Sequence, residues 1–285
     1  MKYYVVIPAH NEAGFIQKTL QSLVDQSLLP EKVIVVNDHS TDDTEQLIDQ
    51  FAQEHTIINK LNTASSEAHM PGSKVVNAFN KGLEQLDENY DFIVKLDADI
   101  ILPKNYFRKV AEVFAKDPSI GIAGGFAYEE DQHGNWLLNH PMHKDHIRGA
   151  FKAYTKETFK AIKGLRCAMG WDTLDELLAR YQGYRIQSIE SLKVKHLRPT
   201  GKSYNKKARL LQGKAMYTMG YGFVLTFIAS IKMALMNKRP KVVLDNLSGY
   251  FKAKNDHVPL IVSKEEAEFI RAYRWKNIKG QLGLS

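Results

Sequence analysis

Short apolar runs alternate with helix-spaced apolar residues along the first 126 positions. Runs typical of strands occupy 3–7, 32–36, 57–61, 92–96 and 120–123. Between them apolar residues recur at helical spacing, first Ile16, Leu20 and Leu23, then Leu47, Ile48 and Phe51, then Val75, Val76, Phe79 and Leu83. This alternation predicts an α/β fold in which a mainly parallel, twisted sheet is flanked by helices.

Polar side chains follow three of the expected strands. Residues 8–12 (PAHNE) follow the first strand, residues 37–42 (NDHSTD) the second, and Asp97 and Asp99 the fourth. Because open α/β sheets bind ligands at the carboxyl ends of their strands, we expect these groups to converge on one crevice. The second cluster is also typical of a helix N-cap followed by acidic residues, an interpretation that the pattern alone leaves open.

The sequence contains no glycine-rich phosphate loop, neither GxGxxG nor GxxxxGK[ST], which argues against a nicotinamide-dependent enzyme and a P-loop NTPase. Asp97 and Asp99 offer another way to neutralise a diphosphate. Two carboxylates spaced by two at the end of a strand project to the same side. Hard oxygen ligands in this arrangement suit Mn²⁺ or Mg²⁺, which bridge to phosphate oxygens.

Composition limits the class of protein further. The 285 residues are 44% hydrophobic and 25% charged, which is typical of a folded globular chain. This length suits one large domain, or one domain with an appendage. Cys167 is the single cysteine, so an internal disulfide framework and a zinc site built from several thiolates are excluded. The first ten residues lack the apolar stretch of a secretory signal, and we therefore expect a cytoplasmic protein.

Five segments of the chain resemble family 2 glycosyltransferases, which have the GT-A (nucleotide-diphospho-sugar transferase) fold. In the family's order and spacing they are VVIPAHNE (5–12), VIVVNDHSTDDT (33–44), GSKVVNAFNKGL (72–83), VKLDADIILP (94–103) and GWDTLDE (170–176). Each segment alone is weak evidence, whereas the ordered set is strong. On this basis we expect a GT-A catalytic domain over 1–200 and a basic, mostly helical C-terminal extension over 201–285.

The resemblance implies roles for single residues in donor binding. The residues that would contact the nucleotide-sugar are Pro8, Ala9, His10, Glu12, Asp38, Lys74, Asn80 and Asp97. Asp99 matches the second carboxylate of the DxD motif and would ligate Mn²⁺ or Mg²⁺. His196 matches a histidine that some related enzymes use near the metal, and the alternative is an ordinary surface histidine.

One turn departs from the family pattern. The family often has Asp-Asp-Gly where this chain has Asn37-Asp38-His39. Asp38 keeps the carboxylate that matters more for the nucleotide, while His39 stands in the place of a glycine.

Asp172 is the expected catalytic base. Transfer of a sugar with inversion needs a group that removes the proton of the acceptor hydroxyl as its oxygen attacks. The resemblance implies this role for Asp172, which precedes Gly183 by eleven residues as the family's acidic base does. Asp175 and Glu176 are neighbours that could serve instead. The competing interpretation is structural, with Asp172 as an N-cap and Asp175 at the third helical position.

A basic and apolar segment follows the expected catalytic domain. No acidic residue lies between Glu190 and Asp245, whereas twelve Lys and Arg do. Residues 215–231 carry no charge. This stretch is short for a membrane-spanning helix and contains glycines. A helix lying in the headgroup region of an anionic membrane fits better, a buried helix comes second and a spanning helix third.

Together these observations predict a metal-dependent, inverting glycosyltransferase. It would use a nucleotide-diphospho-sugar donor and a lipid-linked or saccharide acceptor in the synthesis of cell-envelope polysaccharide or glycolipid. We expect a cytoplasmic enzyme that is peripheral on the inner face of the cell membrane. Nucleic acid is not an expected partner, because aromatic residues are not interleaved with the lysines and no nucleic-acid-binding motif is present.

Two other functions remain open. A nucleotidyltransferase-like enzyme can share the α/β core and the paired carboxylates, but residues 8–15 (PAHNEAGF) lack the glycine- and arginine-rich loop expected of it. A catalytically silent, membrane-bound scaffold of the same fold is the non-enzymatic alternative. The presence of Asp38, Asp97, Asp99 and Asp172 together argues against that scaffold.

Overall fold

A computed structural model describes residues 1–64, 72–139, 146–198, 206–281 and 283. The chain divides into two compact units. The first comprises 1–69, 74–165 and 182–200, and the second comprises 70–73, 166–181 and 201–285. The expected division placed everything before residue 201 in one domain. In the structure, the short segments 70–73 and 166–181 group with the C-terminal helices.

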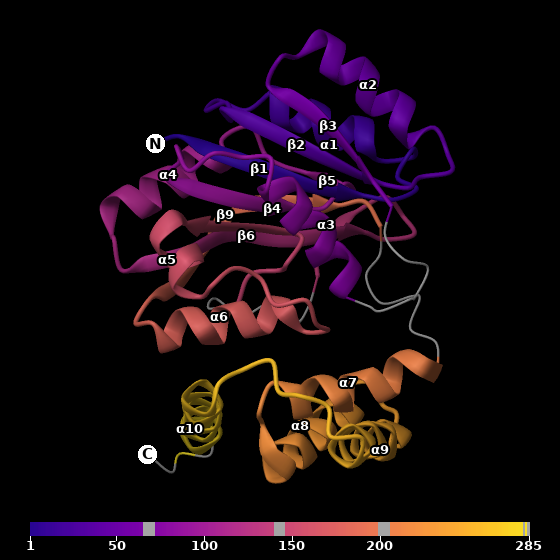
Figure 1. Cartoon of the computed structure of the whole chain (residues 1–285), viewed down its shortest axis with the longest axis vertical. Coiled ribbons are helices and arrows are strands. Elements are labelled where there is room, and N and C mark those ends of the chain that lie inside the picture. Colours follow the sequence, from indigo (N-terminus) through magenta and orange to yellow (C-terminus); the bar gives the residue numbers. More distant parts are fainter. Residues whose placement is uncertain (65–71, 140–145, 199–205, 282, 284–285) are drawn as a thin grey trace. The chain divides into compact units, whose positions relative to one another are not determined.

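A twisted sheet forms the centre of the first unit (Figure 1). Its strands lie in the order β3-β2-β1-β4-β8-β6-β9-β5, with β7 paired to β6. Their bounds are β1 Tyr3–Ala9, β2 Lys32–Asp38, β3 Ile58–Thr63, β4 Phe92–Leu96, β5 Ile100–Ile101, β6 Ile120–Glu130, β7 Trp136–Leu138, β8 Phe151–Thr155 and β9 Arg185–His196.

The direction of these strands confirms the mainly parallel α/β sheet expected from the sequence. Strands β3, β2, β1 and β4 are parallel neighbours, and β6 is parallel to β9. Strand β8 runs antiparallel between β4 and β6, and the two-residue strand β5 runs antiparallel along β9. As a result, β1, β2 and β4 end at the same edge of the sheet, where the polar motifs begin.

Helices cover the sheet of the first unit. Their bounds are α1 Ile16–Val24, α2 Thr44–Glu54, α3 Ser73–Leu83, α4 Tyr106–Lys116 and α5 Lys156–Ala161. The helical spacing found in the sequence corresponds to buried faces, since Ile16, Leu20 and Leu23 of α1 have no solvent exposure. Helix α3 packs tightly on the sheet at Gly82, where an added Cβ would lie 2.5 Å from Cγ1 of Val6.

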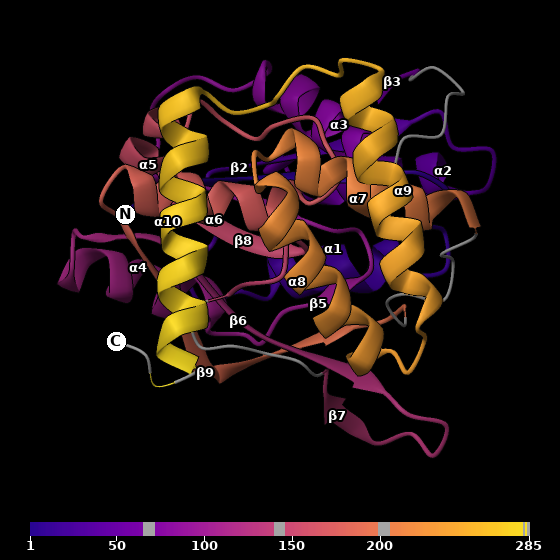
Figure 2. The same ribbon diagram turned by 90° about the horizontal axis from the view of Figure 1, so that it is seen from below.

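The second unit is helical. It contains α6 Trp171–Tyr181, α7 Lys206–Thr218, α8 Gly222–Met236, α9 Lys241–Asn255 and α10 Lys264–Gln281. Figure 2 shows α8 and α9 running side by side. Helices α7 and α9 pack very closely at Gly249. A Cβ added to this glycine would lie 2.0 Å from the carbonyl oxygen of Leu210. Helix α6 packs on α10, with the rings of Tyr181 and Phe269 5.4 Å apart.

The uncharged stretch 215–231 is not one helix. Its first residues finish α7, and α8 begins only at Gly222. Gly220 has a φ of +72°, a left-handed conformation that ends α7. Met216 and Met219, before the break, are buried, whereas Phe223 and Phe227, after it, are exposed. Among the described residues, no helix combines the length and the apolar character needed to cross a bilayer.

Candidate active site

The loops that follow β1 and β2 are joined by hydrogen bonds. The backbone N–H of Glu12 donates to Oγ1 of Thr44 at 2.7 Å, and that of Thr41 donates to Oδ1 of Asn11 at 2.8 Å. His10 is exposed, and its Nδ1 lies 2.7 Å from the carbonyl oxygen of Asp38. These bonds hold the segment PAHNE against the second loop, so the two motifs lie together at the edge of the sheet.

Asp38 and His39 shape the second loop. Asp38 ends β2 and is 7% exposed, and Oγ1 of Thr63 on β3 donates to its carboxylate at 3.2 Å. His39 has a φ of +53°, in the left-handed region that glycine adopts most easily. The histidine at the family's glycine position therefore keeps a backbone conformation that a glycine would allow. On the neighbouring strand, Pro8 is half-buried and Ala9 is buried at the end of β1.

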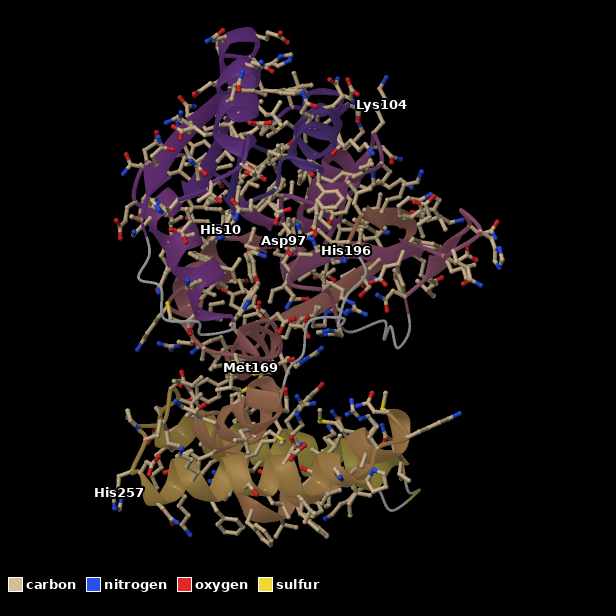
Figure 3. The ribbon with its side chains drawn as sticks, turned by 90° about the vertical axis from the view of Figure 1, so that its right-hand side faces the viewer. His10, Asp97, Lys104, Met169, His196 and His257 are labelled. Carbon is tan, nitrogen blue, oxygen red and sulfur yellow. The ribbon has the colours of Figure 1, made fainter. Side chains whose placement is uncertain are left out.

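The two carboxylates of the DxD motif follow β4 and differ in exposure. Asp97 has a side chain that is 31% exposed and accepts a hydrogen bond from Nζ of Lys95, a lysine with an exposed fraction of only 2%. The side chain of Asp99 is 9% exposed. Figure 3 places Asp97 between His10 and His196 in that view, on the first unit.

Strand pairing places His196 beside Asp99. Ile100 of β5 is paired with His196, and the backbone N–H of Leu197 donates to the carbonyl oxygen of Asp99 at 2.9 Å. Nε2 of His196 consequently lies 3.4 Å from Oδ1 of Asp99. Burial lowers the pKa of His196, but the carboxylates of Asp99, Asp97 and Glu129 outweigh it, so the pKa is raised overall.

Arg198 joins the first loop to the DxD motif. Its Nη2 donates to Oε2 of Glu12 at 2.5 Å, and its Nε lies 3.9 Å from Oδ2 of Asp99. The guanidinium also lies 5.1 Å from the centre of the Phe15 ring. Burial raises the pKa of Glu12 to about 7, the Asp99 and Asp97 carboxylates add to the rise, and Arg198 opposes it.

Three charged residues of this site were not predicted from the sequence. Arg198 contacts Glu12, Lys95 contacts Asp97, and Glu129 of β6 is paired directly with His196. Oε1 of Glu129 lies 3.9 Å from Nδ1 of His196, which makes no hydrogen bond to any residue that the structure describes. Lys95 had a usable signal, because a lysine inside an otherwise apolar strand needs a partner. Arg198 and Glu129 had none, since only the sheet register brings them near the motif.

The donor groups at the DxD motif fit a hard divalent cation that is shared with a ligand. Asp99 and His196 supply a carboxylate and an imidazole, both of which Mn²⁺ accepts. Within the described ranges, no three His, Cys, Asp or Glu side chains form a ready-made metal cluster. Mg²⁺ and similar ions are commonly held by one or two carboxylates together with substrate phosphates. The residues therefore suit an ion that binds together with a diphosphate.

The other candidate residues lie on two helices. Lys74 and Asn80 are both half-buried on α3, and six positions place them about 120° apart around the helix axis. Asp172, Asp175 and Glu176 belong to α6 of the second unit. Their spacing puts all three carboxyl groups on one face of that helix. The prediction that these acids act together with the DxD motif stays a prediction.

Exposure distinguishes the three acids of α6. Asp172 is half-buried, whereas Asp175 and Glu176 are 2% and 5% exposed. The backbone N–H of Glu176 donates to Oδ1 of Asp175 at 2.6 Å. The helix begins at Trp171, so Asp172 lies within the first turn, and the interpretation of Asp172 as the N-cap is wrong.

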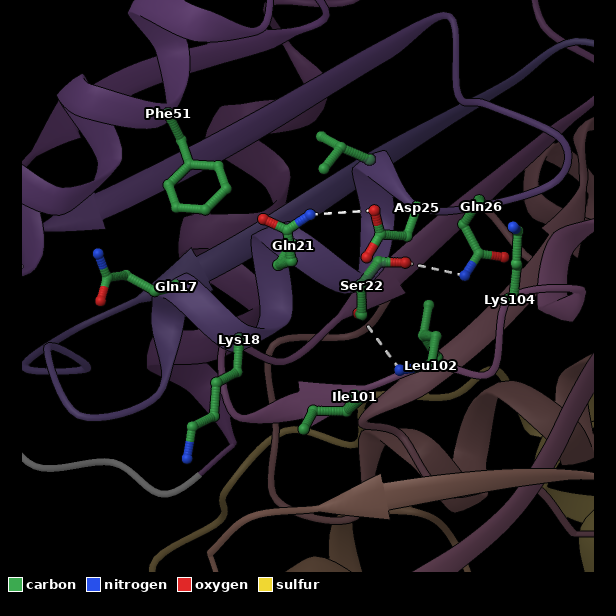
Figure 4. A pocket seen from close by; sticks show the side chains of 11 residues that line it. Gln17, Lys18, Gln21, Ser22, Asp25, Gln26, Phe51, Ile101, Leu102 and Lys104 are labelled. Carbon is green, nitrogen blue, oxygen red and sulfur yellow. Dashed lines mark hydrogen bonds between the residues drawn. The ribbon is translucent and has the colours of Figure 1, made fainter.

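Polar side chains of α1 and of the turn that follows it hold the DxD segment in place. The hydroxyl of Thr19 donates to the carbonyl oxygen of Ala98 at 2.7 Å and accepts from the N–H of Ile100 at 3.1 Å. Ser22 accepts from the N–H of Leu102 at 3.2 Å, and Gln26 donates to the carbonyl oxygen of Pro103 at 3.0 Å. A pocket beside these bonds, lined by α1 and by Phe51 and Lys104, is drawn in Figure 4.

Comparison with known proteins identifies the family. The sequence profile named Glycosyl transferase family 2 matches residues 4–174, which is more than half of the chain. The chain belongs to glycosyl transferase family 2. The family 2 resemblance seen in the sequence motifs is thereby confirmed.

Curated relatives are similar over part of the chain. Poly-beta-1,6-N-acetyl-D-glucosamine synthase of Staphylococcus epidermidis is 27% identical over 121 residues, which are 42% of this chain and 27% of that protein. An uncharacterized glycosyltransferase of Mycoplasma genitalium is 30% identical over 121 residues, 42% of this chain and 38% of that protein. The matched region thus spans well under half of the length of either relative.

Solved structures share the fold of this family 2 chain. A mannosyltransferase from Pyrobaculum calidifontis in complex with GDP-Man and Mn²⁺ has a TM-score of 0.58 at 16% identity, covering 97% of this chain and 80% of that one. Staphylococcus aureus TarS 1–349 in complex with UDP-GlcNAc has a TM-score of 0.56 at 18% identity, covering 99% and 80%. At these identities the likeness shows the fold, and the expected GT-A architecture is confirmed.

Replacement of Thr19 tests how the DxD segment is held. Thr19→Val removes a hydroxyl with no solvent exposure and leaves the carbonyl of Ala98 and the N–H of Ile100 without that partner. We expect the free energy of unfolding in a denaturant titration to fall by about 1–3 kcal/mol. Thr19→Ser, which keeps the hydroxyl, is the control and should lose much less. Equal stability of the valine variant and the wild type would contradict this assignment.

The raised pKa of Glu12 predicts a dependence of stability on pH. With a folded-state pKa of about 7 against an ordinary value of 4.5, the folded protein holds a proton that the unfolded chain has lost. The stabilisation is complete below about pH 4.5 and is lost as the pH rises through 7, a change of about 3 kcal/mol at most.

Denaturant unfolding from pH 5 to 8, with a chelator present, measures this effect of Glu12. The stability advantage of wild type over Glu12→Gln should shrink steadily as the pH rises. Glu54→Gln, an exposed glutamate at the end of α2, is the matched control and should follow the wild-type profile. Parallel profiles for wild type and Glu12→Gln would show that the pKa of Glu12 is not raised.

Proposed function

We propose that this family 2 protein transfers a sugar, with inversion, from a nucleotide-diphospho-sugar to a hydroxyl group of a lipid-linked or saccharide acceptor. The transfer would serve the synthesis of cell-envelope polysaccharide or glycolipid. The observation that carries the proposal is the convergence of Glu12, Asp99, His196 and Arg198 at the carboxyl ends of β1 and β4. Two carboxylates, an imidazole and a guanidinium at that edge suit a diphosphate bound together with a cation.

In this proposal the nucleoside lies against the rim formed by the first two loops. Pro8, Ala9, His10 and Glu12 contribute one side, and the carboxylate of Asp38 is the candidate partner for the ribose or the base. Lys74 and Asn80 of α3 are the candidate contacts to the nucleotide and its diphosphate. The mannosyltransferase structure is a complex with GDP-Man and the TarS structure a complex with UDP-GlcNAc, which supports a nucleotide-sugar as the donor class.

Asp99 and His196 would hold Mn²⁺ or Mg²⁺, with Asp97 beside them. Such an ion supplies charge neutralisation for the departing diphosphate. Arg198 contributes a second positive charge close to Asp99. The guanidinium of Arg198 bonds to Glu12. When the donor binds, it would exchange this carboxylate for a phosphate oxygen.

The proposed base is Asp172. Its carboxylate takes the proton of the acceptor hydroxyl while the hydroxyl oxygen forms a bond to the anomeric carbon from the side opposite the diphosphate. The bond between that carbon and the diphosphate oxygen breaks, and the electron pair leaves with the nucleoside diphosphate. Asp175 and Glu176 are the alternative bases. Asp175 and Glu176 are buried, whereas Asp172 is half-buried. Because a base must reach a substrate hydroxyl, this difference favours Asp172 as the base.

We also propose that the enzyme works at the cytoplasmic face of the cell membrane as a peripheral protein. A lipid-linked acceptor would be presented there. Twelve cations and no acidic residue between Glu190 and Asp245 support an anionic surface as partner.

Replacement of Asp99 tests the metal and donor site. Titration calorimetry of wild type with UDP, GDP and TDP, each with and without Mn²⁺, should reveal binding of one nucleotide that needs the ion. Asp99→Asn should lose about tenfold or more of that affinity, because an amide oxygen is a much weaker ligand than a carboxylate. The same titration without Mn²⁺ is the control. Undiminished affinity of Asp99→Asn in Mn²⁺ would remove Asp99 from the site.

Replacement of Asp172 tests the base. Asp172→Asn should bind the nucleotide and Mn²⁺ like wild type but release nucleoside diphosphate from the matching nucleotide-sugar at least a hundredfold more slowly. Asp175→Asn and Glu176→Gln, on the same face of α6, are the matched comparisons. Full activity of Asp172→Asn together with an inactive Asp175 or Glu176 variant would move the base to that neighbour.

A further inference from the structure

Helix α8 carries a stripe of large apolar side chains that face solvent. Phe223, Phe227, Ile231 and Leu235 recur every four residues, and Val224 lies beside them. Their exposed fractions run from 39% for Phe227 and Ile231 to 74% for Leu235. The other side of the helix is buried. A soluble helix normally shows polar residues outward, so this stripe is the reverse of the usual pattern.

Buried polar groups fix which side of α8 faces inward. Thr226 and Ser230 have no solvent exposure, and Nδ2 of Asn246 on α9 donates to Oγ of Ser230 at 3.1 Å. Asn246 itself is 1% exposed. Because this bond anchors the polar side of α8 on α9, the helix cannot rotate its apolar stripe inward without leaving buried polar atoms unpaired.

Helix α9 continues the exposed apolar surface. Leu244 and Phe251 are 67% and 42% exposed, and the ring of Phe251 lies 5.5 Å from the ring of Phe223. Figure 2 shows the two helices side by side, and the contact between Phe223 and Phe251 joins their exposed apolar residues. We call this surface the α8–α9 face; it consists of Phe223, Val224, Phe227, Ile231, Leu235, Leu244 and Phe251. Contiguous exposed apolar surface of this kind marks an interaction site.

Exposed cations lie on the same two helices and in the turn between them. The exposed basic residues are Lys232 on α8, Lys238 and Arg239 in the turn, and Lys241, Lys252 and Lys254 on α9. The same range, 222–256, contains two acidic residues, Asp245 and Asp256. Six positive charges against two negative ones, on the helices that carry exposed phenylalanine and leucine, is the composition of a surface that binds anionic lipid.

We propose that the α8–α9 face inserts into the headgroup region of an anionic bilayer while its cations contact lipid phosphates. The proposal deepens the peripheral membrane placement proposed above, on which it rests, by assigning it to a two-helix surface. It replaces the single interfacial helix over 215–231 that the sequence predicted. Both helices have 15 residues and therefore about 22 Å of length, which suits lying in the plane of the membrane.

A second copy of the chain fits this face less well than a membrane. A two-fold symmetric contact through the α8–α9 face would bring like surfaces together. That contact would bring the six exposed cations of one copy towards those of the other, and the cost of like charges opposes that pairing. An anionic bilayer accepts the apolar stripe and the cations at once.

Vesicle sedimentation tests the proposal with the full-length chain. Wild type should pellet with vesicles of phosphatidylglycerol and phosphatidylcholine, and remain in solution with phosphatidylcholine alone. The double variant Phe227→Glu/Leu235→Glu should bind the anionic vesicles at least tenfold more weakly. Leu137→Glu replaces a leucine of β7 that is 55% exposed on the first unit, and this matched control should bind like wild type.

Two further experiments separate the electrostatic attraction of the cations to lipid from the insertion of apolar side chains into the bilayer. Lys238→Glu/Arg239→Glu/Lys241→Glu should also lose at least tenfold in vesicle binding, and added salt should weaken wild-type binding. For insertion itself, Leu235→Cys in a Cys167→Ser background is labelled with an environment-sensitive dye. Its emission should shift to the blue with anionic vesicles, whereas the same dye at Leu137→Cys should not respond.

Three outcomes would overturn the proposal. If the wild type stays in solution with anionic vesicles, the α8–α9 face does not bind membranes. A Phe227→Glu/Leu235→Glu variant that pellets like wild type binds membranes elsewhere. If the wild type is a dimer in light scattering, does not bind vesicles and becomes a monomer in this variant, the face belongs to a contact with a second copy.

Each variant is also titrated with nucleotide and Mn²⁺. Vesicle binding without nucleotide binding would contradict the proposed sugar transfer alone. Nucleotide binding without vesicle binding would contradict only the membrane placement and the role of the α8–α9 face.

Discussion

The pairing of the two-residue strand β5 with the end of β9 is the constraint on which the candidate site depends. The N–H of Leu197 bonds to the carbonyl of Asp99, and this register sets His196 next to the DxD carboxylate. Two residues later, Arg198 reaches Glu12 of the first loop. A shift of β9 by one residue would turn His196 to the other side of the sheet and break the set.

Charge balance explains the electrostatics of the crevice. Several carboxylates lie close together at one edge of the sheet, which is unfavourable unless cations accompany them. Arg198 supplies positive charge, Lys95 bonds to Asp97, and the pKa values of His196 and Glu12 are both raised by the nearby carboxylates. A site that collects this much negative charge is suited to a divalent ion, and its protein cations are suited to phosphate.

Buried hydrogen bonds between polar groups have a different consequence in each unit. In the first unit, Thr19 and Ser22 of α1 and Gln26 just after it bond to the backbone at and beyond the DxD motif, so buried hydrogen bonds preserve the geometry of a site. In the second unit, the bond between Asn246 and Ser230 fixes the rotation of α8 and keeps its apolar stripe outside. The same kind of interaction organises a crevice in one unit and an exposed surface in the other.

By itself, the sequence determined the alternating strands and helices, the DxD carboxylates and the basic character of the C-terminal segment. Those features depend on local periodicity and on residue type. The tertiary structure alone decided that β8 runs antiparallel, that Glu129 and Arg198 join the site, and that residues 215–231 are divided between two helices at Gly220. Glu12 and Arg198 are 186 positions apart, and such contacts follow from the register of the whole sheet, which no local pattern encodes.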